Sequence, residues 1–248
     1  MAENRIPVAA VVGPTATGKT ELGIGLCQRL GGEVVSCDSM QVYRGLPIGT
    51  AQPTPEELAA APHHLIGFLD VNQPFSVSDY VEAAGKAIQG IRARGKFPVL
   101  VGGTGLYARS LLRGFSFEEN GRDEALRQKL FRQAEEQGAD ALYRRLQELD
   151  PKAAEEIHPH NVKRVVRALE YIQLCGEPFS QQAERSRTAQ SPYQYVMLCL
   201  TYRDREALYR RIDQRVDRML EQGLLEEARL FFNRCQGSER IPTAAQAI

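Results

Sequence analysis

Three groups of residues in this sequence have the types and spacing needed for chemistry on a phosphorylated compound. The first has the pattern G-x-x-x-x-G-K-T, and its residues are Gly13, Pro14, Thr15, Ala16, Thr17, Gly18, Lys19 and Thr20. Glycines let the backbone curl around an anion, Lys19 adds a positive charge, and the Thr20 hydroxyl can ligate Mg²⁺. The pattern predicts a phosphate-binding loop. ATP is its default ligand, and any other diphosphate fits the same geometry.

The second and third groups each place a polar side chain after a short apolar run. Asp38, Ser39, Met40 and Gln41 follow one such run, and Thr104 lies in the glycine-rich segment 102–105 that follows another. A carboxylate at such a place could act as a general base or ligate a metal through water. Asp38 could equally cap the following turn, and a structural turn is the alternative for the glycine-rich segment. The residues alone leave both questions open.

Two helical segments carry clustered cations. One follows Asp204 and contains Arg211 and Arg215, which are four residues apart and so share a helix face. In many P-loop enzymes a second source of arginine covers the phosphates, which is a candidate role for this face. The other segment contains Lys163, Arg164 and Arg167, although a solvated surface is the usual meaning of such a run.

The flanking elements predict how these groups come together. Val8–Val12 is an apolar run typical of a buried parallel strand, and Glu21–Leu30 has helical periodicity. Because strand, loop and helix agree, a chance match to the phosphate-loop pattern is disfavoured. Further strands are predicted at 33–37, 62–69, 97–101 and 195–200. In a doubly wound sheet the carboxyl ends of strands line one crevice, so Asp38 and Thr104 should lie near the phosphate loop.

The middle of the chain has a different pattern. Residues 44–57 predict a loop, a helix capped by Ser76 runs to about Gly95, and strand patterns disappear after residue 115. Helical periodicity then covers 122–137, 140–149 and 160–175. The predicted fold is α/β, with a P-loop NTPase-like parallel sheet core and an inserted all-helical domain. The core would comprise 1–114 and 190–248, and the insertion 115–189.

Composition limits the classes of protein to consider. The 248 residues are 43% hydrophobic and 25% charged, as in soluble globular proteins, and the formal net charge of zero gives no general support for a nucleic-acid partner. Five cysteines without a C-x-x-C pair predict reduced thiols, and the lack of a signal peptide or membrane span predicts a cytoplasmic location. Adjacent strand residues point to opposite faces, so His63 and His64 favour hydrogen bonding over one shared metal.

Taken together, the motifs resemble those of bacterial tRNA dimethylallyltransferases, also called tRNA isopentenyltransferases or IPP transferases. The resemblance rests on the order and spacing of segments 13–20, 38–43, 49–51, 62–65, 101–107 and 167–170. It implies transfer of a dimethylallyl group from dimethylallyl diphosphate to N6 of adenine 37 in the tRNA anticodon loop, with Mg²⁺ as cofactor. The products would be N6-(dimethylallyl)adenosine and diphosphate. The loop at 13–20 would then hold a prenyl diphosphate in place of ATP.

The resemblance also implies roles for individual residues. Asp38 would be the general base, Ser39, Met40 and Gln41 would hold the target adenine, and Thr104 would contact the base region and the reacting end. Arg211 would neutralise the diphosphate, and Thr20 would ligate Mg²⁺. The tRNA contacts of the insertion would be Arg127, Lys163, Arg164, Val165, Val166 and Arg167.

The same resemblance gives expectations about partners and completeness. The partners would be the tRNA anticodon stem-loop and dimethylallyl diphosphate, with no membrane involved, and the protein would be a monomer. The family pattern continues beyond Gln246-Ala247-Ile248, which implies a chain truncated at its C-terminus. The competing hypotheses are a small-molecule P-loop kinase with a helical lid and an ATP-dependent switch. Neither of these needs Asp38–Gln41 or a basic insertion helix.

Overall fold

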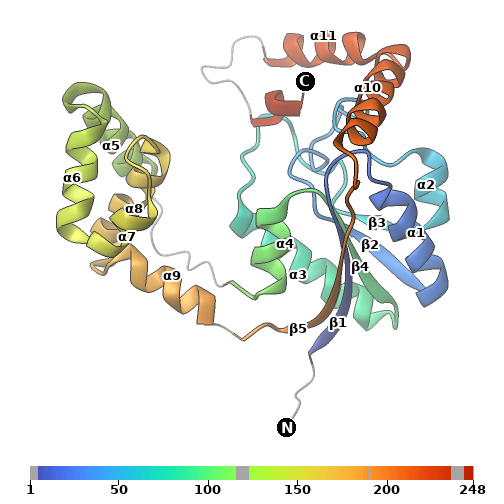
Figure 1. Ribbon diagram of the computed structural model, residues 1–248, viewed down its shortest axis with the longest axis horizontal. Helices are drawn as coiled ribbons and strands as arrows, with labels where there is room; N and C mark the ends of the chain where they lie inside the picture. Colours follow the sequence, from blue (N-terminus) through green and yellow to red (C-terminus); the bar gives the residue numbers. More distant parts are fainter. Residues whose placement is uncertain (1–4, 116–122, 189, 236–242, 248) are drawn as a thin grey trace. The chain divides into compact units, whose positions relative to one another are not determined.

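The computed structural model describes residues 5–115, 123–188, 190–235 and 243–247. The chain divides into two compact units (Figure 1). The first, here called the core unit, comprises Met1–Arg113 and Ser191–Ile248. The second, here called the helical unit, comprises Gly114–Gln190.

The core unit contains a parallel sheet with the order β3-β2-β4-β1-β5. Its strands are β1 (Ile6–Val12), β2 (Gly32–Ser36), β3 (His63–His64), β4 (Phe97–Gly102) and β5 (Tyr193–Cys199). Because all neighbouring strands are parallel, their carboxyl ends meet at one edge of the sheet. The prediction of a P-loop-like α/β fold with a parallel sheet is confirmed.

β3 is much shorter than the predicted strand at 62–69. Leu65 has a φ of 65° and Gly67 a φ of 55°, so the chain leaves the extended conformation directly after His64. The two histidines form hydrogen bonds, as favoured from the sequence. His64 Nε2 lies 2.6 Å from Glu33 Oε2, and His63 Nδ1 lies 2.7 Å from the Ala61 carbonyl oxygen.

Four helices of the core unit follow the strands in the chain. They are α1 (Lys19–Leu30), α2 (Pro55–Ala60), α3 (Val77–Ala93) and α4 (Gly105–Leu112). α2 begins inside the segment predicted as a loop, where Thr54 and Glu57 form a capping box around Pro55 at the first helical position. That signal was present in the sequence and was missed. Ser76 and Asp79 form the same kind of capping box at the start of α3.

Helices cover both faces of the sheet (Figure 1). On one face, Tyr80 and Ile88 of α3 and Leu111 of α4 pack in a cluster with Ala10 and Leu100. On the other face, α1 packs against β1, β2 and β4, and the cluster consists of Val11, Ile24, Cys27, Val34, Ala61, Val99 and Val101. Burial of these apolar side chains on both sides explains why β1 and β4 read as nearly continuous hydrophobic runs.

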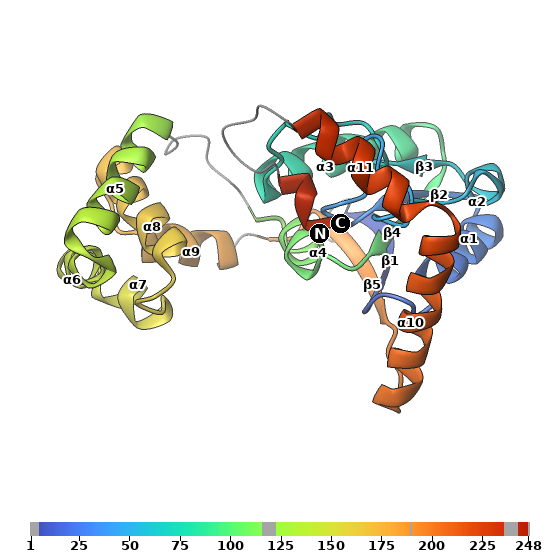
Figure 2. The same cartoon turned by 90° about the horizontal axis from the view of Figure 1, so that it is seen from above.

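Two further helices end the described part of the core unit. α10 (Arg205–Glu221) and α11 (Leu224–Cys235) meet at a corner and run in different directions (Figure 2), and a 3-10 helix follows at Thr243–Ala247. Asp204 caps α10 as predicted, because its carboxylate accepts the N–H groups of Glu206 and Ala207. Phe231 of α11 packs with Val42 and Leu46. α11 is therefore packed on the segment that follows β2.

The helical unit contains five described helices. They are α5 (Glu124–Gln137), α6 (Ala139–Leu149), α7 (Pro151–Glu156), α8 (Val162–Cys175) and α9 (Phe179–Thr188). α5, α6 and α8 confirm the three predicted helices, whereas α7 and α9 were not predicted. α6 ends at Leu149, and Pro151 is the first residue of α7, after the N-cap Asp150. Leu130, Leu146 and Leu169 lie in the core of this unit.

The exposure of the cysteines differs: Cys27 and Cys37 are buried, Cys175 and Cys235 are partly exposed, and Cys199 is exposed. Burial raises the pKa of the Cys27 thiol to about 11 and that of Cys37 to about 12. We therefore expect iodoacetamide near pH 8 to modify the exposed Cys199 first and to leave Cys27 and Cys37 unmodified in the folded protein, since the thiolate is the reactive form. Peptide mass spectrometry after a timed reaction would measure this order. Early modification of Cys37 would contradict it.

Within the described ranges, none of the helices is long and apolar enough to cross a membrane. The same residues hold no group of three or more His, Cys, Asp or Glu side chains placed to share a metal ion.

Candidate active site

The phosphate loop, Asp38 and Thr104 follow three adjacent strands. β4 lies between β1 and β2, with Val12 opposite Gly102 and Ser36 opposite Val101. A Cβ atom at Gly102 would lie only 2.1 Å from the Cys37 carbonyl oxygen, so only glycine allows this approach of β4 to β2. The sequence prediction that these three segments meet at one edge of the sheet is confirmed.

The phosphate loop is held in a curled conformation by its own side chains. Gly13 has a φ of 151°, and a Cβ atom there would lie 2.4 Å from the Leu200 carbonyl oxygen. Lys19 Nζ and Thr17 Oγ1 both donate hydrogen bonds to the Pro14 carbonyl oxygen, at 2.6 and 2.9 Å. Because α1 begins at Lys19, the free N–H groups of its first turn are available to an anion in the loop.

The charges around Lys19 act on one another. Burial lowers the pKa of the Lys19 ammonium group, the Asp38 carboxylate opposes this shift, and the Arg215 guanidinium adds to it. Burial also lowers the pKa of Arg215, again with Asp38 acting in the opposite direction. The three side chains therefore belong to one electrostatic cluster of two cations and one carboxylate. Such a cluster suits a ligand that brings further negative charge.

Asp38 caps the turn that follows it and still has an oxygen available. Its Oδ1 accepts hydrogen bonds from the N–H groups of Met40, at 2.9 Å, and Gln41, at 3.3 Å. Among the described residues, no hydrogen bond to Oδ2 is found. The cap role and the base role, left as alternatives by the sequence, are thus compatible: one oxygen orients the carboxylate and the other can accept a proton.

The Thr104 hydroxyl joins its own loop to the Asp38 segment. Oγ1 accepts a hydrogen bond from the Ser39 N–H at 3.0 Å and lies 3.3 Å from Ser39 Oγ, to which it can donate. Thr104 is the N-cap residue of α4, but its side chain forms no capping hydrogen bond with that helix. Its N–H instead donates to the Cys37 carbonyl oxygen at 3.1 Å. The glycine-rich loop therefore supports the segment at 38–41. Its role is wider than that of a local structural turn, the alternative left open by the sequence.

The cation that contacts the phosphate loop directly is Arg215. Its Nη1 donates a hydrogen bond to Thr15 Oγ1. Arg211, the arginine chosen from the sequence, donates to the Tyr202 hydroxyl at 2.6 Å, and this hydroxyl donates to the Ala16 carbonyl oxygen at 3.2 Å. Arg211 therefore reaches the loop through Tyr202. The spacing of four placed both arginines on one helix face but could not show which one reaches the loop.

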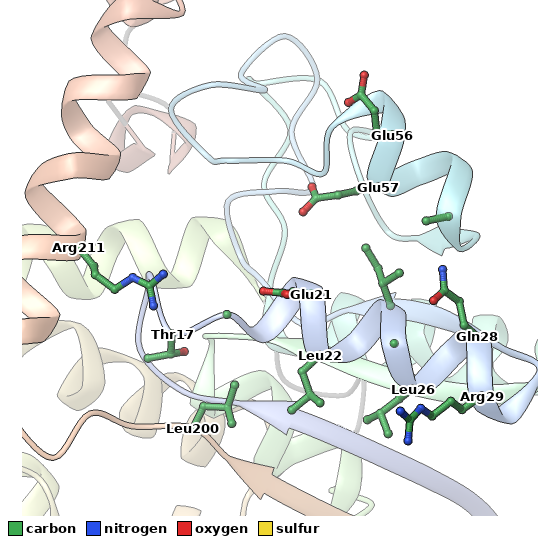
Figure 3. Close-up of a pocket in the computed structure, with 14 residues that line it drawn as sticks. Thr17, Glu21, Leu22, Leu26, Gln28, Arg29, Glu56, Glu57, Leu200 and Arg211 are labelled. Atoms are coloured by element: carbon green, nitrogen blue, oxygen red, sulfur yellow. The ribbon is translucent and has the colours of Figure 1, made fainter.

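Arg211 also borders a cleft of about 940 Å³ on the outer side of α1 (Figure 3). Figure 3 shows its guanidinium directed toward Thr17, while Glu21, Glu56 and Glu57 line the cleft from α1 and α2. Asp38, Lys19 and Thr104 do not line it. Thr17 and Gly18 of the phosphate loop do line it, so the cleft adjoins the loop but does not contain the carboxylate and hydroxyl that follow β2 and β4.

The contrast between the two arginines can be measured with inorganic diphosphate as the probe. We expect Arg215→Ala to weaken its binding by about tenfold or more, the usual effect of losing one charge-assisted hydrogen bond. Arg211→Ala should have a smaller effect because Tyr202 lies between it and the loop. Isothermal titration calorimetry of both variants measures the difference. A larger loss for Arg211→Ala would reverse the assignment.

Comparison with known proteins places this site in a family. The sequence matches the family "IPP transferase" over residues 41–248 and "Isopentenyl transferase" over residues 6–66. The chain belongs to the IPP transferase family. The tRNA dimethylallyltransferases of Geobacillus kaustophilus and Halalkalibacterium halodurans are 48% and 46% identical to this transferase. Each match covers 94% of this chain, and it covers 75% of the first relative and 76% of the second.

Solved structures of IPP transferases have the same fold. The full-length tRNA isopentenylpyrophosphate transferase of Bacillus halodurans is 44% identical, with a TM-score of 0.66 over 97% of this chain and 73% of that chain. A eukaryotic dimethylallyltransferase described as acting on tRNA is 29% identical, with a TM-score of 0.84 over 97% of this chain and 59% of that one. This transferase spans about three quarters of the length of its bacterial relatives.

The structure corrects two of the RNA contacts expected in the helical unit of this transferase. Val165 and Val166 are each only 1% exposed and lie in the core of that unit. Their side chains stabilise the packing of α8 and cannot contact an RNA on the surface. Lys163 and Arg164, which directly precede them on α8, are exposed. They remain candidates for contact with phosphates.

Arg127 and Arg167 share one buried carboxylate. Both guanidinium groups lie 3.0 Å from Glu170 Oε2, and the Glu170 side chain is 0% exposed, whereas each arginine side chain is 31% exposed. Glu170 Oε1 also accepts the Asp123 N–H at 3.0 Å, at the start of α5. Glu170 therefore holds the two arginines in place, and Arg127 also forms an ion pair with Glu124 at 3.3 Å. The sequence did not indicate this carboxylate as part of the cluster.

Proposed function

We propose that this transferase moves a dimethylallyl group from dimethylallyl diphosphate to N6 of adenine 37 in the tRNA anticodon loop. The products are N6-(dimethylallyl)adenosine and diphosphate. One observation carries the proposal: a phosphate loop, a carboxylate and a hydroxyl follow three adjacent parallel strands in a chain of the IPP transferase family. The loop reads the charge of the diphosphate and needs no nucleobase, so a prenyl diphosphate suits it as well as ATP.

The groups at the sheet edge match the charges that the reaction creates. The lone pair on N6 attacks carbon 1 of the prenyl chain, the bond from this carbon to oxygen breaks, and its electrons leave with the diphosphate. Asp38 Oδ2 accepts the proton lost from N6. Lys19 and Arg215 stabilise the leaving diphosphate, whose negative charge increases as the bond breaks. No further reactant is needed for the atoms to balance.

The adenine must leave its stack to reach this edge. A base within the anticodon loop is single-stranded, and proteins read such bases after they turn outward. Ser39, Met40 and Gln41 form the wall beside Asp38, and the Thr104 hydroxyl supports this wall through Ser39. We propose that this wall holds the flipped adenine with N6 toward Asp38. Aligning N6 with carbon 1 supplies the proximity effect that a weak amine nucleophile requires.

Mg²⁺ fits the oxygen donors at this edge. The Thr20 hydroxyl lies in the first turn of α1, and no hydrogen bond from it to another described residue is found. A hydroxyl, a carboxylate and diphosphate oxygens are the hard ligands that Mg²⁺ prefers. We propose that Thr20 holds the ion against the diphosphate. The ion would supply further neutralisation of the leaving group's charge.

The function is tested by analysis of the product. The protein is incubated with dimethylallyl diphosphate, Mg²⁺ and an anticodon stem-loop RNA, and the digested nucleosides are analysed by mass spectrometry. We expect N6-(dimethylallyl)adenosine from the RNA that carries adenine 37 and none from a matched RNA that carries guanine there. Equal modification of both RNAs, or no modified nucleoside from a folded protein, would refute the proposal.

The exposed cations of α8 should contribute to RNA affinity in a salt-dependent way. We expect Lys163→Ala combined with Arg164→Ala to weaken binding of the stem-loop and to reduce the slope of log K against log salt by roughly one to two. Fluorescence anisotropy over a salt series measures both quantities. The matched control is Arg92→Ala with Lys96→Ala, which removes two exposed charges near the amino end of β4. Equal slopes for the two double variants would contradict the assignment.

We further propose that the transferase works as a monomer in the cytoplasm, where its tRNA substrate is found. Sedimentation at working concentrations would test the first part. A stable dimer would overturn it.

A further inference from the structure

A buried carboxylate on α11 binds the backbone of a loop far away in the sequence. Glu227 is 7% exposed. Its Oε2 accepts the Ile48 N–H at 2.9 Å, and its Oε1 accepts the Gly49 N–H at 2.7 Å. Both oxygens are therefore used, each in a charge-assisted hydrogen bond to a backbone donor. No role at this position was predicted from the sequence.

The loop that Glu227 holds is compact, and it presents two carbonyl groups to Gln41. Thr50 Oγ1 donates to the Leu46 carbonyl oxygen at 2.6 Å, and the Ala51 N–H donates to that of Ile48 at 2.9 Å. Ala51 has a φ of 47°, an uncommon conformation for a residue other than glycine. Gln41 Nε2 donates to the carbonyl oxygens of Ala51, at 2.8 Å, and Thr50, at 3.4 Å.

Gln41 connects this loop to the proposed base. Its Oε1 accepts a hydrogen bond from Ser36 Oγ at 3.1 Å, so both ends of its amide are bound. Its N–H donates to Asp38 Oδ1 at 3.3 Å, and its carbonyl oxygen accepts a hydrogen bond from Gln52 Nε2 at 3.0 Å. A path of hydrogen bonds and short backbone steps therefore runs from Glu227 through the loop at 48–52 to Gln41 and Asp38.

We infer that Glu227 is a positioning residue for the segment Asp38–Gln41, which it orients through the loop at 48–52. The two helices then serve different parts of the site: Arg215 of α10 contacts the phosphate loop, and Glu227 of α11 binds the loop that supports Gln41. The inference rests on the proposed function, since it assigns Glu227 to the RNA-facing half of that site. Glu227 touches neither substrate.

Glu227 must be a carboxylate to bind this loop fully, because each of its two oxygens accepts one backbone N–H group. In Glu227→Gln, one acceptor oxygen remains, but an NH₂ group faces the second N–H, so one buried donor loses its partner. The neighbouring Glu226 is an ideal comparison: it is exposed, with its carboxylate 3.6 Å from Arg229. Glu226→Gln therefore makes the same chemical change on the same helix without touching the loop.

The test compares steady-state kinetics of these variants in two backgrounds. We expect Glu227→Gln to lower kcat/KM for the stem-loop RNA by about tenfold, the scale of one lost charge-assisted hydrogen bond, with unchanged affinity for dimethylallyl diphosphate. Glu226→Gln should behave like the wild type. In a Gln41→Ala background, Glu227→Gln should have little further effect, because residues that act through one another are not additive. An undiminished further tenfold loss there would overturn the inference.

Hydrogen exchange separates a failure of this inference from a failure of the proposed function, because it requires no activity. In the free protein we expect Glu227→Gln to accelerate amide exchange at 48–52 and at 40–41, with α3 unchanged as an internal reference. Glu227→Asp, which keeps the charge but is one methylene shorter, should give an intermediate rate. Unchanged protection at 40–41 in Glu227→Gln would overturn the inference even if the wild-type enzyme transfers prenyl groups. A wild-type protein that transfers none would refute the function and leave the exchange result valid.

Discussion

Asp38→Asn lowers the rate of prenyl transfer by about a thousandfold, within the range typical of a lost general base. The substitution keeps an oxygen that can accept the N–H groups of Met40 and Gln41, so the turn keeps its geometry. It replaces Oδ2 with an NH₂ group, which cannot accept the N6 proton. Affinity for dimethylallyl diphosphate should not fall, since the lost negative charge lies beside Lys19 and Arg215.

Single-turnover transfer with saturating prenyl diphosphate and RNA measures this effect apart from binding. Asp213→Asn, at an exposed position of α10, is the matched control for the change in charge. A wild-type rate for Asp38→Asn would leave this carboxylate as a turn cap alone.

The second large effect is expected from Lys19→Ala, which should weaken binding of dimethylallyl diphosphate and slow transfer, together by roughly 10² to 10³-fold. The ammonium group lies within the phosphate loop, with Nζ 2.6 Å from the Pro14 carbonyl oxygen. Because Lys19 is partly buried, fewer water molecules compete with the diphosphate for its charge. Calorimetry gives the loss of affinity, and transfer at saturating substrate gives the loss of rate. Lys96→Ala, at an exposed lysine before β4, is the control.

The lowered pKa of Lys19 adds a pH dependence with a defined sign. Burial favours the neutral amine, so Lys19 loses its proton at a lower pH than an ordinary lysine. Its contribution to diphosphate affinity is present below this lowered pKa and is lost as the pH rises through it. Affinity that stays constant up to the ordinary lysine range would contradict this view of the loop.

The arrangement of the sheet edge could be predicted because local signals agreed. The phosphate-loop pattern, the apolar runs before Asp38 and Thr104, and the rule for carboxyl ends of parallel strands all indicate one site. Gly102 shows the limit of such reasoning: its need for close approach to Cys37 becomes apparent only when β2 and β4 are paired.

The details that could not be predicted depend on contacts between distant segments. Arg211 and Arg215 share a helix face, and only the position of α10 shows that Arg215 reaches Thr15. The sequence indicated the helix at 160–175, but it did not show which face of this helix is buried. Val165 and Val166 lie on that face, in the core of the helical unit. Glu227 is separated by 178 residues from Gly49, and no local pattern connects them.

The kinase and switch hypotheses remain useful because they predict different ligands. Both require ATP in the phosphate loop, and neither gives a function to the hydrogen bonds that join Ser39 to Thr104 and Met40 to Asp38. A chain of the IPP transferase family in which Thr104 supports the segment Asp38–Gln41 agrees better with transfer to a base.

The most direct measurement is transfer of label to an anticodon stem-loop RNA, with labelled dimethylallyl diphosphate in one reaction and γ-labelled ATP in a parallel one. We predict that label enters the adenine 37 RNA from the prenyl diphosphate in the presence of Mg²⁺, and that ATP neither labels the RNA nor competes. An unlabelled RNA in the first reaction, with ATP bound and hydrolysed in the second, would contradict it.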